Sequence, residues 1–425
     1  MDLILLFGVF LLLLFIGLPI SLSMGVSAFV FLLVTGQHHM LIQLPNRMVL
    51  ASEHYGLMAI PFFYLAGSIM VAGGLTQRLI DFSRTIIGHI TGSLSLINVI
   101  ASMVFAGVSG SCVADTSAIG SVLIPAMKKD GYPSAYAAAV TGATSTIGHI
   151  IPPSIPMILI GVLVELPIGN LFLAGAIPGI LLGLSMLLYC YIIAKKRGYP
   201  RTEKRATVKE MFRAFFEGIL VLVTPAIVVG GVVFGIVTVT ETGILTVIYA
   251  LFLSILYKEF SFSKFADLIR ETAQAVANLL MIIATAGFFG WVMVNTGVGD
   301  NLVELILSIS TNKFVVLTLL IVFLLVIGCV LDVLAMVFIF TPVMIPLVQK
   351  VGIDPFHFSA VFVLALGIAL LTPPMGLILY LVKEMSESTL SDVMWETFPL
   401  LIVQFVVLLL VAYVPVLSTW LPSLL

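Results

Sequence analysis

Charged residues are scarce in this chain of 425 residues, since Asp, Glu, Lys and Arg together make up 9% of it. Apolar residues make up 61%, and the mean hydropathy is +1.23. Apolar runs long enough to cross a bilayer recur along the whole chain, and too few charges remain to cover a surface in contact with water. This composition excludes a water-soluble protein. Basic stretches interleaved with aromatic residues are also lacking, which excludes a nucleic-acid-binding domain.

Cysteine is equally rare. The three cysteines, Cys112, Cys190 and Cys329, lie in apolar surroundings without metal-ligand spacing. This pattern excludes a disulfide framework and a zinc site, and it predicts that the thiols are small packing residues. The N-terminal segment has neither a positively charged leader nor an Ala-x-Ala-like cleavage site. We therefore expect it to remain in the protein as a membrane span.

The first half of the sequence predicts a mixture of complete spans and interrupted ones. The apolar run 3–36 would be about 51 Å long as one helix, which exceeds a hydrocarbon core of about 30 Å, and Pro19 divides it into two spans. Polar residues between two short apolar arms at 94–127 predict a re-entrant hairpin, and the prolines within 151–156 predict a broken helix. The other predicted elements are a span at 57–74, a surface helix at 77–89 and a span at 168–194.

Basic residues gather in one segment, 195–213, which holds eight of the nineteen Lys and Arg residues and is predicted to be cytoplasmic. This loop divides the chain nearly in half, and the second half repeats the plan of the first. Each half has an odd number of crossings, so the repeat is inverted and both termini are expected outside the cytoplasm. The second half predicts spans at 216–236, 242–257, 277–294 and 398–421, a surface helix at 262–272, a hairpin at 314–348 and a helix broken at 371–376.

The same constellation of residues occurs once in each half. Cys112-Val-Ala-Asp115 recurs 217 residues later as Cys329-Val-Leu-Asp332, and Pro152-Pro153 recurs 221 residues later as Pro373-Pro374. A carboxylate and a double proline are each costly inside a bilayer, so their repetition indicates that both halves build one site. We predict an all-α integral membrane protein with an inverted repeat, two re-entrant helical hairpins and two broken helices, which is the plan of a secondary transporter.

Oxygen-bearing groups concentrate at the predicted hairpin tips and helix breaks. The first half offers the hydroxyls and the carboxylate of 109–117 together with the Thr and Ser residues of 141–146, and the second half offers Asp332 and Thr372. Sodium is a hard cation that takes oxygen ligands, and unwound backbone with hydroxyls holds it at membrane depth. Two cation sites are therefore predicted. A structural alternative stays open, because an Asp at the start of a hairpin arm also caps a helix.

An anionic substrate suits the same region, because half-helix N-termini at the tips and breaks direct positive dipole ends toward it. Arg47, which precedes a span, is either a substrate contact or an interface anchor. His149, beside the first double proline, is either a proton relay or a hydrogen-bonded packing residue.

Two other classes of membrane protein match parts of the pattern. Gly297-Val-Gly-Asp300 has the letters of the Gly-x-Gly-Asp signature of intramembrane aspartyl proteases, but neither a Tyr-Asp partner nor a Pro-Ala-Leu sequence occurs, so no enzymatic activity is predicted. Re-entrant hairpins also line ion channels. A single chain with inverted repeats and two broken helices favours alternating access over a channel.

Four segments of the sequence resemble the motifs of one transporter family. They are Met58-Ala-Ile-Pro-Phe-Phe-Tyr-Leu-Ala-Gly67, Ser109-Gly-Ser-Cys-Val-Ala-Asp115-Thr-Ser-Ala-Ile-Gly120, Gly148-His-Ile-Ile-Pro-Pro-Ser154 and Thr372-Pro-Pro-Met-Gly376. Together they resemble the large membrane subunit of tripartite ATP-independent periplasmic (TRAP) transporters, over essentially the whole chain. Thr238-Val-Thr-Glu241 resembles a fifth motif, with Val239 where proline is usual.

The resemblance implies sodium-driven uptake of an organic acid, such as a C4-dicarboxylate or sialic acid, across the bacterial inner membrane. It implies two partners, a small membrane subunit and a periplasmic substrate-binding protein. Because no small-subunit segment precedes Met1, we expect the small subunit to be a separate chain. The implied Na⁺ ligands are Ser111, Asp115, Gly148, Gly328, Asp332 and Thr372. The candidates for contact with the substrate are Ser109, Thr116, Thr144, Ser145, Pro153, Pro374 and Arg47.

The family looks like an elevator, in which a mobile transport domain slides against a scaffold. Carried onto this sequence, the transport domain comprises 94–165 and 314–384, and the scaffold comprises 1–93, 166–313 and 385–425. The alternative function is that of a stand-alone divalent-anion/sodium symporter of similar architecture that needs no binding protein.

Overall fold

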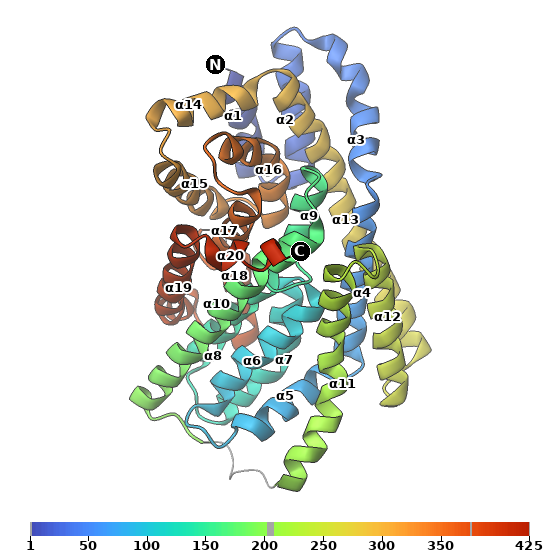
Figure 1. Ribbon diagram of the computed structural model, residues 1–425, viewed down its shortest axis with the longest axis vertical. Helices are drawn as coiled ribbons and strands as arrows, with labels where there is room; N and C mark the ends of the chain where they lie inside the picture. Colours follow the sequence, from blue (N-terminus) through green and yellow to red (C-terminus); the bar gives the residue numbers. More distant parts are fainter. Residues whose placement is uncertain (1, 202–207, 375, 425) are drawn as a thin grey trace.

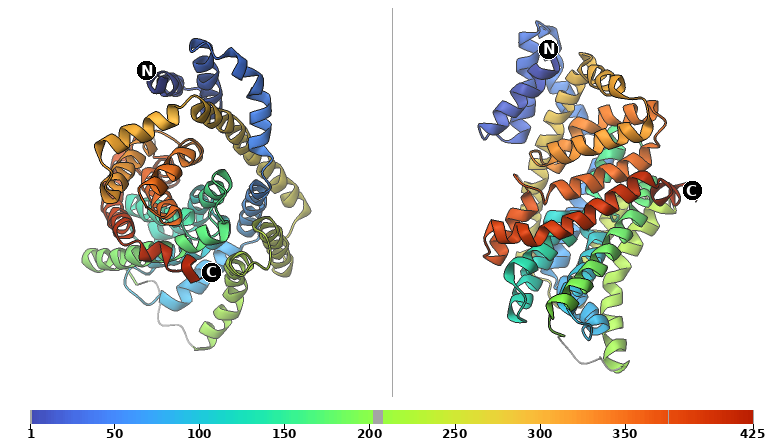
Figure 2. Two further views of the ribbon diagram at one scale, coloured as in Figure 1. Left: turned by 45° about the horizontal axis from the view of Figure 1, so that its top comes forward. Right: turned by 90° about the vertical axis from the view of Figure 1, so that its left-hand side faces the viewer.

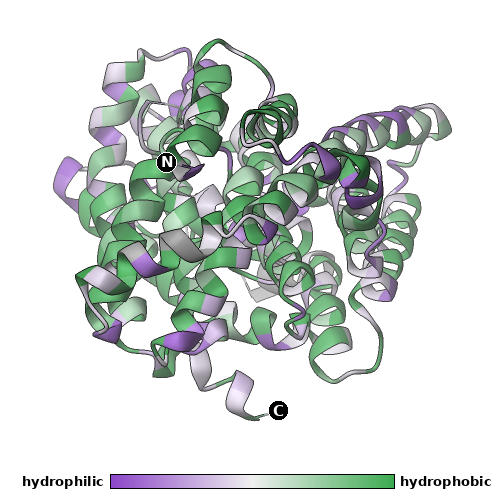
Figure 3. Ribbon diagram, turned by 90° about the horizontal axis from the view of Figure 1, so that it is seen from above, coloured by the Kyte–Doolittle hydropathy of each residue, from purple (hydrophilic) through white to green (hydrophobic). Residues whose placement is uncertain are grey.

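A computed structural model of the chain describes residues 2–201, 208–374 and 376–424. Throughout these residues the regular elements are helices (Figure 1), and hydrophobic residues cover most of them (Figure 3). Within the described ranges six helical segments are long and apolar enough to cross a membrane: Tyr55–Ala72, Ile168–Arg197, Val239–Leu256, Phe262–Asn295, Val333–Lys350 and Leu390–Tyr413. The predicted all-α membrane architecture is confirmed.

Both halves of the chain contain the same series of elements. The first half consists of α1 (Asp2–Phe15), α2 (Ile20–Val34), η1 (His38–Gln43), α3 (Leu44–Ser52), η2 (Tyr55–Met58), α4 (Ala59–Ala72), α5 (Leu75–Ile87), α6 (Ser93–Ser109), α7 (Cys112–Lys129), α8 (Ser134–Ser145), η3 (Thr146–His149), α9 (Ile155–Leu163) and α10 (Ile168–Arg197). The second half consists of α11 (Val208–Val233), α12 (Val239–Leu256), α13 (Phe262–Asn295), α14 (Val298–Ile309), α15 (Lys313–Gly328), α16 (Val333–Lys350), α17 (Pro355–Ala369), α18 (Leu377–Ser386), α19 (Leu390–Tyr413), α20 (Val416–Thr419) and η4 (Pro422–Leu424). The predicted hairpins are the pairs α6–α7 and α15–α16, and the predicted broken helices are α8–α9 and α17–α18.

The predicted cytoplasmic loop 195–213 contains less loop than expected. Its first three residues, 195–197, end α10, and residues from Val208 onward belong to α11. Residues 202–207, in the middle of the predicted loop, lie outside the described residues.

The two halves match at a constant spacing in the region of the hairpins. Pro133 precedes α8 and Asp354 precedes α17, which are 221 positions apart. The helix-internal Pro125 of α7 and Pro346 of α16 have the same spacing. The double prolines, which form cis peptide bonds in both halves, also share it. The second half is therefore a copy of the first, shifted by about 221 residues.

The predicted span 398–421 begins and ends earlier in the structure, as α19, and a larger difference from the prediction occurs before the second hairpin. A surface helix at 262–272 and a separate span at 277–294 were expected, but α13 runs through both without interruption, because no proline or glycine separates them. After it, Gly297 adopts a left-handed conformation and α14 begins, an element that the prediction lacked. Gly74 is the left-handed residue that precedes α5, and its φ of 68° is close to the φ of 71° at Gly297.

The hairpins and broken helices of both halves pack into one body, α6–α9 with α15–α18, which we call the hairpin unit. Within it, α18 of the second half packs on α7 and α8 of the first, and α16 packs on α9. Figure 2 shows α1–α3 (blue) and α12–α13 (olive to gold) along one side of this unit. Among the surrounding helices, α5, α10 and α19 also pack on this unit, and α4 and α13 contact it through α6 and α16 respectively. The two tips thus meet beside α4 and α13.

Candidate functional site

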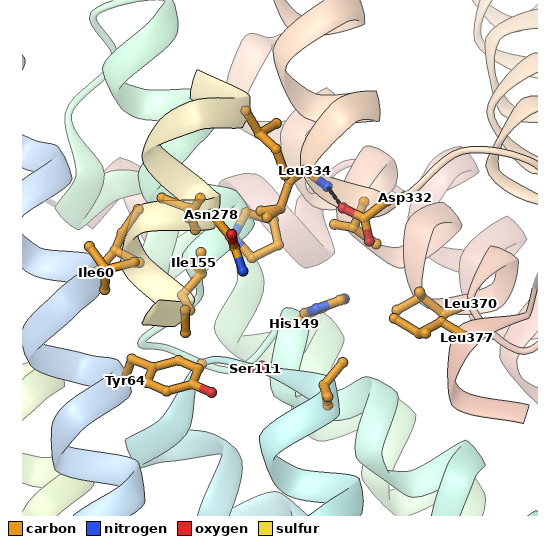
Figure 4. A pocket seen from close by; sticks show the side chains of 18 residues that line it. Ile60, Tyr64, Ser111, His149, Ile155, Asn278, Asp332, Leu334, Leu370 and Leu377 are labelled. Carbon is orange, nitrogen blue, oxygen red and sulfur yellow. Dashed lines mark hydrogen bonds between the residues drawn. The ribbon is translucent and has the colours of Figure 1, made fainter. Parts of the chain in front are cut away.

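A cavity of about 250 Å³ lies where the two hairpin tips meet. Its walls come from both halves of the hairpin unit and from two surrounding helices, α4 and α13. Figure 4 shows Ile60 and Tyr64 of α4 on one side, Asp332 and Leu370 on the other, and His149 between them. The lining residues are Ile60, Tyr64, Gly110, Ser111, Val113, His149, Ile155, Pro156, Ala275, Val276, Asn278, Leu279, Ile282, Asp332, Val333, Leu334, Leu370 and Leu377.

The first tip encloses a carboxylate. Gly110 turns the chain in a left-handed conformation after α6, and Ser111 caps α7 by accepting a hydrogen bond from the Ala114 N–H at 3.4 Å. Asp115 lies one turn into α7 and is fully buried. The Ser109 hydroxyl donates to Asp115 Oδ1, whereas Asp115 Oδ2 has no hydrogen-bond partner among the described residues.

The unpaired oxygen faces the break between α8 and α9. A Cβ atom added at Gly148 would overlap Asp115 Oδ2 and would lie 3.1 Å from Asp115 Cγ. Glycine is therefore the side chain that leaves room beside the carboxylate. A buried carboxylate oxygen without a partner is costly unless a cation or a donor satisfies it. The donor set of Asp115, Ser109, Ser111 and backbone carbonyls fits a small hard cation.

The second tip presents its carboxylate differently. Asp332 is the N-cap residue of α16 and accepts a hydrogen bond from the Leu334 N–H at 3.0 Å (Figure 4). Its side chain is half-buried and lines the cavity. Behind it, Gly328 packs so closely on α17 that a Cβ atom there would lie 2.6 Å from the Ala369 Cβ. The Thr372 hydroxyl donates to Ile368 O at 2.8 Å.

The two carboxylates therefore do not occupy equivalent places. At the spacing of 221, Asp332 corresponds to Ser111, and both residues cap the second arm of a hairpin. Asp115 corresponds to Met336, which is fully buried. The identical Cys-x-x-Asp letters, 217 positions apart, suggest an equivalence of Asp115 and Asp332 that the helix positions do not bear out.

The sequence matches the family model described as "Tripartite ATP-independent periplasmic transporter, DctM component" over residues 7–417. The chain belongs to this family. Its relatives include the sialic acid TRAP transporter large permease protein SiaM of Vibrio cholerae, with 36% identity over 97% of this chain and 96% of that protein. The C4-dicarboxylate TRAP transporter large permease protein DctM of Rhodobacter capsulatus is 33% identical, with complete coverage of both chains. The relatives are named as permeases of transporters, which are not enzymes.

A solved structure has the same fold. The YdaH transporter of Alcanivorax borkumensis superimposes with a TM-score of 0.66, at 16% sequence identity, over 99% of this chain and 98% of that one. The likeness supports the fold of this DctM-family chain and does not extend to its substrate.

Several other predicted substrate contacts of this DctM-family protein use their hydroxyls inside the hairpin unit. Thr144 donates to Asn98 Oδ1 at 3.0 Å and accepts from Ser102 at 2.9 Å. Thr116 donates to the Cys112 carbonyl at 2.7 Å, and Ser145 donates to the Thr141 carbonyl at the same distance. These threonine and serine residues do not line the cavity.

The remaining predicted contacts lie at the helix breaks and outside the hairpin unit. The Pro153 carbonyl lies against Gly110 of the first tip. The Pro374 carbonyl accepts from the Tyr380 hydroxyl at 3.3 Å. Arg47 of α3 places its guanidinium 5.0 Å from the centre of the Trp291 ring, a cation–π contact away from the cavity lining.

Two polar residues of the cavity were not predicted from the sequence. Tyr64 belongs to the segment that resembles a family motif, but only the segment as a whole was noted. Asn278 is an amide near the start of an apolar run, and a polar residue within a span is itself a signal of function. Tyr64 belongs to α4 and Asn278 to α13, so they face the hairpin unit across the cavity.

Proposed function

We propose that this chain is the translocating subunit of a sodium-coupled TRAP transporter that imports an organic acid into bacteria. The relatives' names support the substrate class, since they include sialic acid, C4-dicarboxylate and, for YiaN of Escherichia coli, 2,3-diketo-L-gulonate permeases. A small membrane subunit and a periplasmic binding protein are the proposed partners. The basic residues at 195–213 support a cytoplasmic location for the segment between α10 and α11, and the proposed orientation has both termini on the periplasmic face of the inner membrane.

The observation that carries sodium coupling is the unpaired Oδ2 of Asp115 beside Gly148. Ser111, Asp115 and the Gly148 backbone would hold one sodium ion at the first tip. Asp332 and the backbone around Gly328 and Thr372 would hold a second ion at the other tip. A bound sodium ion supplies positive charge next to the cavity, which neutralises buried carboxylates and attracts an organic anion.

Alternating access in this proposal is an elevator movement of the hairpin unit against α4 and α13. Two helices that were predicted as scaffold belong with the moving part on the basis of their packing. α10 packs on α6 and α17, and α19 packs on α8 and α17. Gln404 of α19 donates to the Ala143 carbonyl and to the Thr146 hydroxyl, both at 3.1 Å. These buried bonds would break if α19 stayed in place while α8 moved.

Thermal unfolding in different salts tests sodium binding without knowledge of the substrate. The detergent-purified chain is melted in sodium, potassium and choline chloride, as wild type and as Asp115→Asn and Asp332→Asn. We expect stabilisation by sodium alone, and a smaller sodium effect in both variants.

Asp354→Asn is the matched control, because Asp354 caps α17 away from the cavity and Asn caps as well as Asp. Equal stability of the wild type in all three salts would contradict sodium binding. In proteoliposomes, sodium-driven uptake by this chain alone at micromolar substrate would contradict the three-component assembly.

A further inference from the structure

The lining of the cavity carries information about the substrate that the relatives' names do not contain. The cavity volume of about 250 Å³ lies below the 300–1,000 Å³ typical of sites for drug-sized ligands. The cavity therefore favours a small substrate.

Most of the lining is apolar. The apolar lining residues include Ile60 of α4, Ile155 of α9, Leu279 and Ile282 of α13, and Leu334 and Leu377 from the second half. A hydroxyl-rich substrate would lose water on entering and would find few partners among these side chains, which disfavours it strongly. An apolar chain or ring would gain by the same transfer.

The charges on the lining argue against a second carboxylate. Among the described residues that line the cavity there is no Lys or Arg, and Asp332 is the one ionisable carboxyl group. A sodium ion at the second tip would balance Asp332 itself, and no side-chain cation of the lining would remain for the second negative charge of a dicarboxylate. An unbalanced charge in a poorly solvated space is costly.

One corner of the cavity suits a single carboxylate. Ser111 and Val113 lie there at the N-terminus of α7, where the first N–H groups of a helix have no partner within the helix. His149 lines the same space, is 7% exposed, and its Nδ1 has no hydrogen-bond partner among the described residues. In Figure 4 its ring lies in the space between Ser111 and Asp332. In the tautomer that carries its proton on Nδ1, this buried nitrogen would donate to a ligand oxygen.

We infer that the substrate of this chain is a small monocarboxylate with an apolar body. Its carboxylate lies at Ser111 and His149, and its apolar body lies against α13. The inference rests on the proposed function, which it narrows. The cavity then selects against the substrates for which SiaM and the DctM of Rhodobacter capsulatus are named, although this chain shares their family.

Three six-carbon acids separate the classes of substrate. Hexanoate carries one carboxylate and an apolar chain, adipate has a carboxylate at each end, and gluconate has one carboxylate and a chain of hydroxyls. The purified full chain is melted in sodium chloride and in potassium chloride while each acid is titrated. We expect hexanoate to stabilise the protein in sodium with an apparent Kd at least tenfold lower than that of adipate or gluconate.

Substitutions in the cavity wall test whether the preference arises there. Leu279→Asn should reduce the preference for hexanoate over gluconate at least tenfold, since one misfit group in an apolar pocket changes discrimination about 10- to 200-fold. Leu280→Asn is the matched control, because its neighbour Leu280 does not line the cavity and should leave the preference unchanged. His149→Phe should raise the apparent Kd for hexanoate at least tenfold, and His149→Asn, which restores a donor, should recover most of the affinity.

The outcomes distinguish the inference from the proposed function. Equal or tighter binding of adipate or gluconate, or no effect of any acid while sodium still stabilises the protein, overturns the substrate class and leaves sodium coupling intact. Unchanged hexanoate affinity in His149→Phe overturns the assigned carboxylate corner. Equal melting temperatures in sodium and potassium without any acid would instead overturn the proposed function.

Discussion

The substitution Gly148→Ala tests the first cation site by adding a single methyl group. The new Cβ would overlap Asp115 Oδ2, whereas real Cβ atoms stay at least about 3.0 Å from their neighbours. The carboxylate must therefore move by about 1 Å, into packed surroundings. Overpacking of this kind costs about 1–3 kcal/mol. It also takes the oxygen out of the position in which it would bind sodium.

The size of the expected signal follows from linkage. Sodium at 100 times its Kd stabilises the native state by about 2.7 kcal/mol. With about 2.1 cal/mol/K of unfolding entropy for each residue, this corresponds to about 3 °C for a chain of this length. We expect the wild type to melt about 3 °C higher in sodium chloride than in potassium chloride. Gly148→Ala should lose most of this difference and should melt lower than the wild type in potassium chloride as well.

Gly290→Ala is the control. Gly290 lies within α13, and a Cβ atom there would meet nothing within 4 Å, so this variant should be neutral or slightly stabilising and should keep the full sodium effect. Differential scanning fluorimetry in the two salts gives the melting temperatures of the wild type and of both variants. A Gly148→Ala protein with the full sodium effect would refute the assignment of this oxygen to a cation site.

Three further predictions test the dynamics and packing of the hairpin unit. Cys329 is half-buried beside the second tip, so it should react with a maleimide while the two other, fully buried cysteines do not. Sodium should slow this reaction. Equal labelling of all three cysteines in intact mass spectrometry would contradict the prediction. Gln404→Leu should destabilise the protein by about 1–3 kcal/mol, because Thr146 and the backbone lose a buried donor, and an unchanged melting temperature would contradict this. In an otherwise cysteine-free chain, a short bis-maleimide should join cysteines that replace Ile60 and Val113, which both line the cavity. This cross-link should stop uptake by the reconstituted transporter. Uptake that survives cross-linking would contradict an elevator movement.

Interruptions of the fold could be predicted from the sequence because prolines and glycines act locally. Pro19 separates α1 from α2, and the double prolines at 152–153 and 373–374 separate the two parts of each broken helix. Gly110 marks the turn at the first tip. Each of these residues restricts or frees the backbone at its own position, so the sequence alone shows where a helix cannot continue.

The features that escaped prediction depend on contacts between distant segments. The polar start of α13 was predicted as a separate surface helix, because the sequence does not show that the helix continues into the span. The identical letters around Asp115 and Asp332 hide a difference of one helical turn, which is set by where each hairpin turns. Asn278 becomes part of the site only because α13 packs beside the tips.

The correspondence of Ser111 and Asp332 has a consequence for the symmetry of the site. An inverted repeat with identical halves would look the same from either side of the membrane, and nothing in its geometry would distinguish inside from outside. Here the pseudo-symmetric pair of capping residues is neutral in one half and acidic in the other. The carboxylate therefore lies at the cap in the second tip and one turn into the arm in the first, so a charged substrate meets unlike surroundings at the two tips.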